Sequence, residues 1–356
     1  MMTDQERYEQ VDMPFYRAEI APVLPPRVLD FHVHTSEPEH RRTVPWKTDA
    51  PGAKYMVTTE AYPVDDLLAD RARLFPDRPY GIVCFGWAGP SSDVEKTNAY
   101  ASRLAAQKDL YPLLLAGNGL VPVEDLRRGV CEDGAFGYKV FMDWVGDNYG
   151  DVTIEHMLGT AERELADELG LVILLHVPRA GRLADPVVQE GVRDLACNHP
   201  NARIVLAHCG RCYLPDEMAR AVDSVADLDN VYLDTAMVMD PTVLQIVLEQ
   251  IPSSRLVYAT DLPIALMRGR RVYVMDHWVD MVLEGYPASA YRIASEGIRA
   301  SFMVYEIILA IRRAAERSGL TESEMHGIFY DNGMSLLEHV RDGRQLAEVE
   351  ARRSAS

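Results

Sequence analysis

The chain has 356 residues, of which 48% are hydrophobic and 25% charged, the composition of a globular protein that can bury a large core. Its formal charge of −18 comes from 54 acidic against 36 basic side chains. Such a charge repels nucleic acid and anionic membrane surfaces, so we expect neither as a partner.

The first residues do not show the basic and then apolar pattern of a signal peptide, and no apolar run reaches the roughly 18 residues of a spanning helix. We therefore expect a cytoplasmic protein. Its five cysteines are an odd number in a long chain, which argues against a disulfide framework. The sequence leaves the oligomeric state open, including a homo-oligomer.

Short apolar runs with β-branched or aromatic residues recur along the chain at a spacing that suits strands joined by crossover helices. They predict eight strands, at residues 28–34, 80–86, 111–116, 137–142, 171–176, 203–208, 231–236 and 255–261. Helical patterns lie between them, among others at 64–74, 92–107, 154–169 and 215–225. This order favours a closed (β/α)₈ TIM barrel over an open doubly wound sheet, and no Gly-rich phosphate motif opens the first helix.

Four segments lie outside this alternation of strands and helices. Residues 1–27 form an N-terminal extension, the barrel occupies 28–340, and 341–356 form a polar tail that we expect to fray. Residues 35–62, rich in Pro, Thr, Glu and Lys, predict a long loop after the first strand that covers the mouth of the barrel. From about residue 269 to 340 the pattern predicts mainly extra C-terminal helices.

Residues with metal-binding or catalytic side chains fall at the ends of the predicted strands. Asp30, His32 and His34 alternate on one face of the first strand. The later strands contribute Lys139, His176, His208 and Asp261. In a closed barrel these ends meet at one mouth, and imidazole with carboxylate suits zinc, manganese or iron. One such histidine alone would more often be a hydrogen-bonded core residue, but the set favours a metal site.

This set of motifs resembles the amidohydrolase superfamily, and within it amidohydrolase family 2, a group of metal-dependent TIM-barrel hydrolases and decarboxylases. The resemblance covers about residues 28–340, including Tyr330-Asp331-Asn332-Gly333 near the end. It implies that the metal ligands are His32, His34, His176 and Asp261. It also implies that His208 orients or deprotonates the attacking water, or polarises the substrate.

The role of Lys139 separates two versions of such a site. In two-metal relatives a lysine on the fourth strand is carboxylated and bridges the ions, whereas the family 2 pattern needs no bridge. The resemblance to family 2 favours one ion, which we expect to be Zn²⁺, and two ions remain the alternative. With one ion, Lys139 would be a cation near the substrate, unless it is a surface or ion-paired lysine.

The chemistry that follows is hydrolysis of an amide, ester or lactone by a metal-activated water, with Asp261 taking the proton and later delivering it to the leaving group. Arg179 and Arg211 follow two of the histidine-bearing strands and could hold a carboxylated, anionic small molecule. Each arginine could instead pair with an aspartate of a nearby loop, such as Asp185. Non-oxidative decarboxylation by the same metal is the alternative reaction.

Two other classes of protein compete with this interpretation. The opening His-x-His also resembles phosphoesterases of the PHP type, but these require a late Asp-x-His, whereas Leu262 and Pro263 follow Asp261. A non-catalytic metal-binding scaffold has no reason to keep the full ligand set. The Cys209 to Cys212 C-x-x-C spacing lacks a second pair for a zinc knuckle, so we expect no role for it in the chemistry.

Overall fold

The computed structural model describes residues 2–41, 61–87, 89, 91–145, 150–275, 277–283, 290–292 and 299–354. Within these ranges a ring of parallel strands forms the centre of the molecule: β1 (Val28–His34), β2 (Tyr80–Phe85), β3 (Leu110–Pro112), β4 (Leu114–Ala116), β5 (Gly137–Val140), β6 (Val172–Leu175), β7 (Arg203–Leu206), β8 (Val231–Asp234) and β9 (Leu256–Val257). All eight predicted strands are present, the third one divided into β3 and β4 at Leu113. The eighth, predicted to reach Asp261, is shortened to Leu256–Val257.

Hydrogen bonds between the first and last strands close this sheet into a barrel. The N–H of Phe31 donates to the Tyr258 carbonyl (2.9 Å), and the N–H of His34 donates to the Leu262 carbonyl (2.8 Å). The strands are buried on both faces, as parallel strands covered by helices must be, and every residue of β6 is fully buried. Closure brings the C-terminal ends of all the strands to one mouth.

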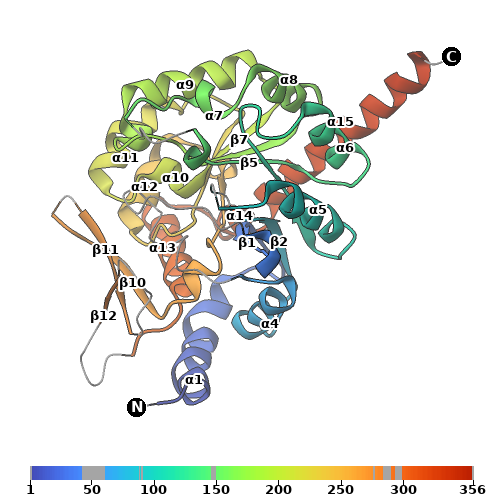
Figure 1. Ribbon diagram of the computed structural model, residues 1–356. Helices are drawn as coiled ribbons and strands as arrows, with labels where there is room; N and C mark the ends of the chain where they lie inside the picture. Colours follow the sequence, from blue (N-terminus) through green and yellow to red (C-terminus); the bar gives the residue numbers. More distant parts are fainter. Residues whose placement is uncertain are drawn as a thin grey trace.

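Helices that follow the strands cover the outside of the barrel (Figure 1): α4 (Val64–Leu74), α5 (Val94–Leu104), α6 (Val123–Cys131), α7 (Ile154–Met157), α8 (Thr160–Glu168), α9 (Pro186–Asn198), α11 (Pro215–Ala221) and α12 (Pro241–Gln250). The predicted helical segments are confirmed, with 154–169 divided into α7 and α8. At the start of α12, Asp240 accepts a hydrogen bond from the Thr242 N–H and Pro241 takes the first helical position.

The prediction that residues 269–340 are mainly helical is wrong in its first part. An antiparallel hairpin of β10 (Gly269–Val274) and β11 (His277–Val282) stands there, with β12 (Ala290–Arg292) beside β11, at one side of the barrel (Figure 1). β10 contains two valines and a tyrosine, and Arg271 lies directly opposite Asp280. Strand-forming residues and an opposite-charge pair across the strands explain why this segment is a hairpin.

The helices after the hairpin are α13 (Met303–Arg317), α14 (Glu322–Phe329) and α15 (Asp331–Ser354). The expectation of a frayed tail from residue 341 is wrong, because α15 continues as a helix through Ser354 and extends beyond the barrel (Figure 1). Buried Leu336, Leu337 and Val340 hold the first half of α15 against the core, and its polar second half continues the same helix.

The N-terminal extension packs against the barrel through short helical turns, from α1 (Asp4–Arg7) to α2 (Met13–Phe15) and on to Val23. Arg268, just before β10, donates two hydrogen bonds to buried Asp12 (2.8 and 2.7 Å) and one to Asp4 (2.6 Å). This ion cluster ties the extension to the base of the hairpin. Of the predicted loop at 35–62, residues 42–60 lie outside the described residues, and a bridge between Ser36 and Tyr62 joins its two ends.

Candidate metal centre

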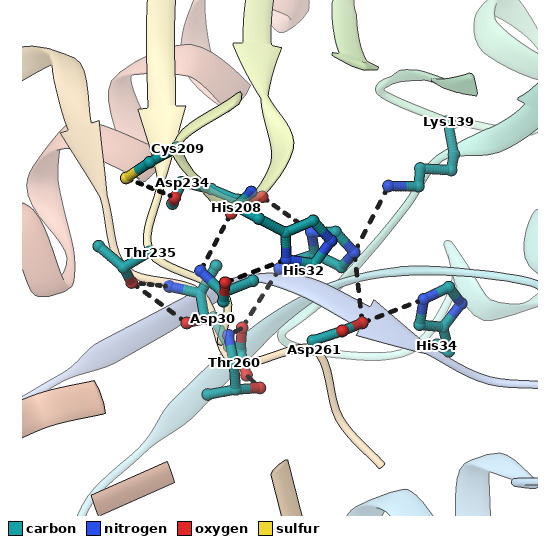
Figure 2. A network of polar contacts seen from close by, with 12 residues as sticks. Asp30, His32, His34, Lys139, His208, Cys209, Asp234, Thr235, Thr260 and Asp261 are labelled. Atoms are coloured by element: carbon teal, nitrogen blue, oxygen red, sulfur yellow. Dashed lines mark hydrogen bonds and ion pairs between the residues drawn. The ribbon is translucent and has the colours of Figure 1, made fainter. Parts of the chain in front are cut away.

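Both histidines of β1 face the same carboxylate at the mouth of the barrel (Figure 2). The Nε2 atom of His34 lies 3.2 Å from Oδ1 of Asp261, and the Nε2 atom of His32 lies 3.5 Å from the same oxygen. The three residues offer ligand atoms that all lie within 4.8 Å of one another. Strand alternation explains the arrangement, since residues two apart on β1 point to the same side.

The other ring nitrogen of each histidine is held by an acceptor. The Nδ1–H of His32 donates to Asp234 (2.8 Å), that of His34 to the Gly86 carbonyl (3.3 Å), and that of His208 to the Ala236 carbonyl (3.0 Å). Because a neutral imidazole carries one proton, each ring keeps a lone pair on Nε2. These bonds fix the tautomer and direct Nε2 for binding a metal or accepting a proton.

Asp234 was not among the residues predicted from the sequence. Its Oδ1 accepts hydrogen bonds from the backbone N–H groups of His208 (2.6 Å) and Ala236 (3.0 Å), and its Oδ2 accepts the proton of His32. With His32 and His208 it forms a second group of possible ligands. The sequence did carry a sign of this residue, because Asp234 is a carboxylate near the end of a predicted strand.

His176 follows the end of β6 and lies between the other rings of the mouth. Its ring centroid is 5.2 Å from that of His208 and 4.4 Å from that of Phe141. It belongs to neither group of three possible ligands, yet its buried Nδ1 has no hydrogen-bond partner among the described residues. A buried polar atom without a partner is costly, and a metal ion would satisfy it.

Lys139 extends from β5 into the same mouth and is fully buried (Figure 2). Its Nζ lies 3.4 Å from Nε2 of His32 and 4.9 Å from the ring centroid of Phe85. Burial lowers the pKa of Lys139 to about 8, although Asp234 and Asp261 act in the opposite direction. The structure therefore excludes a surface position for this lysine.

Burial also determines the charge of the other groups. It lowers the pKa of His32 and of His176 well below the usual value and lowers that of His208, so these rings are neutral at pH 7. Burial alone would raise the pKa of Asp261, but its contact with His34 and the nearby imidazoles of His32 and His208 lower it far below its usual range. Neutral imidazoles beside an ionised carboxylate form a donor set suited to a divalent ion.

The two arginines predicted as substrate anchors both have partners in the loop that follows β6. Arg179 donates to Asp185 (2.9 Å), so the ion pair considered as its alternative role is present. Arg211 donates to the carbonyls of Val177 (3.0 Å) and Arg179 (3.4 Å), and its charge helps to lower the pKa of His176.

Several site residues adopt left-handed backbone conformations, with φ values of 66° for Arg179, 56° for His208 and 71° for Asp261. β7 ends at Leu206, and His208 begins a left-handed turn instead of ending the strand as predicted. Each such residue costs on the order of 1–3 kcal/mol, and such strain concentrates at functional sites. The surrounding hydrogen bonds to Asp234 hold the turn in place.

Trp87 is a further site residue that the sequence did not reveal. It follows β2, is 9% exposed, and stacks on His34 with ring centroids 4.2 Å apart and an interplanar angle of 8°. Its buried Nε1–H has no acceptor among the described residues. The stacked indole fixes the ring plane of His34 and forms one wall of the site.

A closed barrel of parallel strands, with imidazole and carboxylate ligands converging at the C-terminal mouth, defines the class of metal-dependent TIM-barrel enzymes. The family model described as Amidohydrolase, amidohydrolase family 2, matches residues 29–337. The chain therefore belongs to this family of enzymes, as its resemblance implied.

Solved structures share this fold at low sequence identity. A 4-oxalomesaconate hydratase from Rhodopseudomonas palustris is 16% identical, with a TM-score of 0.55 and coverage of 92% of this chain and 99% of that chain. A 2,6-dihydroxybenzoate decarboxylase in complex with 2,6-dihydroxybenzoate is 14% identical, with a TM-score of 0.54 and coverage of 88% and 100%. A dihydroxybenzoic acid decarboxylase from a Polaromonas species, with bound manganese and 2-nitroresorcinol, is 16% identical, with a TM-score of 0.50 and coverage of 88% and 97%.

These similarities show a common barrel. The curated proteins include no significant match to the sequence. Within the described part of the chain, no helix combines the length and apolar character needed to cross a bilayer.

Proposed function

We propose that the chain is a metal-dependent hydrolase that cleaves an amide, ester or lactone bond of a small, carboxylated substrate. The observation that carries the proposal is the convergence of His32 and His34 on one oxygen of Asp261, in a barrel mouth that also holds His208 and Lys139. Membership of the amidohydrolase family agrees with this chemistry.

In this proposal His32, His34, His176 and Asp261 hold one divalent ion, which we expect to be Zn²⁺. Their donor set and the unpartnered Nδ1 of His176 fit such an ion. When bound, the ion supplies a Lewis acid that polarises a carbonyl and makes hydroxide available near neutral pH. Asp234 and the Gly86 carbonyl orient the first two imidazoles toward it.

His208 acts as the general base. Its Nδ1–H is donated to Ala236, and the Nε2 lone pair is therefore available to accept a proton from the attacking water. Its lowered pKa keeps the ring neutral and ready to accept that proton at pH 7. Asp261, ionised and beside the same space, accepts the proton in turn and returns it to the leaving group.

The substrate carboxylate binds to cationic groups at the mouth. Lys139 is buried beside His32 and carries the charge closest to the cluster. Arg211 adds a second cation, whose charge acts on His176, and Arg179 forms an ion pair with Asp185. A bidentate contact between the Arg211 guanidinium and the substrate carboxylate would orient the scissile bond within the site.

Non-oxidative decarboxylation of an aromatic acid is the second candidate. It is favoured by two structural relatives that are named as decarboxylases, one with 2,6-dihydroxybenzoate bound and one with manganese and 2-nitroresorcinol. In that reaction the same site would hold the carboxylate that leaves as CO₂, and a protein acid would protonate the ring carbon.

Turnover of a panel of carboxylated amides, lactones and hydroxybenzoates distinguishes the two reactions. The protein is stripped with EDTA and reloaded with Zn²⁺ or Mn²⁺, and products are followed by chromatography and CO₂ capture. Hydrolysis predicts a new acid with an amine or alcohol and no CO₂. Loss of turnover in His32→Ala, with no rescue by metal, is expected; an unchanged rate in metal-free wild type would refute metal dependence.

A further inference from the structure

A second pocket lies between the barrel mouth and the β10–β11 hairpin. Its volume is about 130 Å³, and its walls come from the loop after α10 (Ala207–Arg211), the loop after β8 and the hairpin. The residues that line it include Tyr213, Met237, Met239, Arg271, Val272 and Trp278. None of the proposed metal ligands lines it, so this hairpin pocket is a separate site.

Two aromatic rings and an arginine form its fixed wall. The Arg271 guanidinium lies 3.9 Å from the ring centroid of Trp278 and 4.7 Å from that of Tyr213, and the two rings are 5.4 Å apart. The same guanidinium donates to both carboxylate oxygens of buried Asp280, at 2.8 and 3.0 Å. A planar cation held in this way keeps the two rings in position before any ligand arrives.

The charges around the pocket leave no excess of positive charge, because the carboxylate of Asp240 also lines it beside Arg270 and Arg271. Arg271 is paired with Asp280, and Arg270, at the edge, lies 3.5 Å from Glu306 and donates to the Met239 carbonyl (3.1 Å). An anionic group of a ligand would therefore meet no unbalanced positive charge in this pocket. Aromatic faces and the thioethers of two methionines favour an uncharged, planar and polarisable ring.

The volume of the pocket and its position relative to the metal centre indicate which part of a ligand would place a ring there. A cavity of about 150 Å³ accommodates benzene, so the volume of about 130 Å³ suits a single ring. Tyr213 forms one wall of the pocket, and its ring centroid lies 5.9 Å from that of His208. The pocket is thus separated from the proposed general base by one aromatic side chain.

We propose that the hairpin pocket binds an uncharged aromatic ring, which forms the distal part of the substrate, and so selects substrates by their length and planarity. The assignment to substrate rests on the proposed function at the metal centre. The pocket itself is independent of the metal, because the proposed metal ligands do not line it.

Filling the pocket tests the proposal. Val272 lines it and is half-buried, whereas Val274 lies two residues along the same strand, is 58% exposed and does not line it. Val272→Phe should block the pocket, and Val274→Phe is the matched control with the same change. Trp278→Leu removes the aromatic wall and provides a second, independent variant.

Binding of two fluorinated probes to the full chain is measured by ¹⁹F NMR, with and without Zn²⁺. Uncharged 4-fluorophenol should bind wild type in both states, and Val272→Phe and Trp278→Leu should each weaken it at least tenfold, while Val274→Phe leaves it unchanged. No binding to wild type, or equal binding to Val272→Phe, would overturn the proposal. Anionic 4-fluorobenzoate should bind at the metal centre, so Lys139→Met should weaken it at least tenfold and Val272→Phe should leave it unchanged; if Lys139→Met leaves it unchanged, the carboxylate site of the proposed function fails while the pocket stands.

Competition against 4-fluorobenzoate on the metal-loaded protein tests whether the pocket holds the distal part of a substrate. Biphenyl-4-carboxylate should lose at least tenfold in affinity in Val272→Phe, and benzoate should keep its affinity. An equal effect on the one-ring and two-ring acids would show that the pocket does not extend the substrate site.

Discussion

The carboxylate of Asp234 accepts the Nδ1–H of His32 at 2.8 Å and so turns Nε2 of that ring toward Asp261 (Figure 2). The same carboxylate holds the backbone N–H of His208. One buried side chain therefore sets the tautomer of a proposed ligand and the backbone position of the proposed base. Partners of this kind tune metal affinity without touching the metal.

Replacing Asp234 by Asn should lower metal affinity by about 10- to 100-fold, because the amide cannot accept as strongly and no longer fixes the His32 tautomer. Competitive titration with a chromophoric zinc chelator measures this. Asp229→Asn, exposed and just before the same strand, is the control and should bind metal as wild type does. Equal zinc affinity in Asp234→Asn, with an unchanged thermal midpoint, would show that Asp234 does not orient the ligand.

The convergence of the proposed ligands could be predicted from the sequence because they stand within or shortly after parallel strands whose C-terminal ends meet at one mouth. Asp234 also stands at a strand end, but its role and that of Trp87 could not be recognised in this way, because they act through hydrogen bonding and stacking on His32 and His34. Those contacts depend on side-chain packing between strands, which the spacing of residues in one strand does not encode.

Stability of the metal-free protein should fall as the pH falls through about 6.5. Burial, with the charge of Arg211, lowers the pKa of His176 well below its usual value of 6.5, so the folded state keeps this ring neutral. The unfolded chain takes up the proton below that pH, and unfolding is then favoured by up to about 1.4 kcal/mol per pH unit for each such group. Asp30 acts in the opposite sense, since burial raises its pKa to about 7.

Comparison of wild type with His176→Gln isolates this effect, because Asp30 is the same in both. Urea unfolding between pH 5.5 and 7.5 should show a shallower loss of stability in the variant, by about 1.4 kcal/mol per pH unit at most. Parallel curves for the two proteins would mean that His176 is not held neutral in the fold.

The barrel could be predicted because its strands are apolar runs bounded by turns, but the hairpin and the end of the last helix could not. β10 and β11 are held by a pairing of Arg271 with Asp280 across the strands, a contact between residues nine apart that helical periodicity does not reveal. The end of α15 is polar, and it continues a helix whose first half is anchored by buried Leu337 and Val340. The polar residues after position 340 suggested a frayed tail. Extending an existing helix costs less than starting a new one, so α15 continues through them.

Arg268→Met should destabilise the protein by about 3–5 kcal/mol, because it removes the cation that is paired with the buried carboxylate of Asp12 and leaves only the Ser301 hydroxyl of its described partners. Chemical denaturation measures the loss. Arg193→Met, which removes an exposed pair with Asp227, should have little effect. If the two variants lost the same stability, the ion cluster would not be what fastens the N-terminal extension to the hairpin.

A Lys139 variant distinguishes a site with one metal ion from a site with two. If one ion is bound, Lys139→Met should keep a metal content of one per chain while the KM for a carboxylated substrate rises about 10- to 100-fold, because a charged hydrogen bond of about 1.5–3 kcal/mol is lost. If a carboxylated Lys139 bridges two ions, wild type should contain two and the variant fewer. Elemental analysis after dialysis separates these cases.

The control for this variant is Lys96→Met, in which the lysine removed is an exposed one, 57% accessible, on α5. It should change neither the metal content nor KM. Methionine matches the length of the buried lysine, so the packing against Phe85 and Phe141 is retained and a loss of folding is not the expected outcome. A variant with unchanged metal content and unchanged KM would show that Lys139 neither bridges ions nor binds the carboxylate, and the substrate anchor would then have to be sought at Arg211.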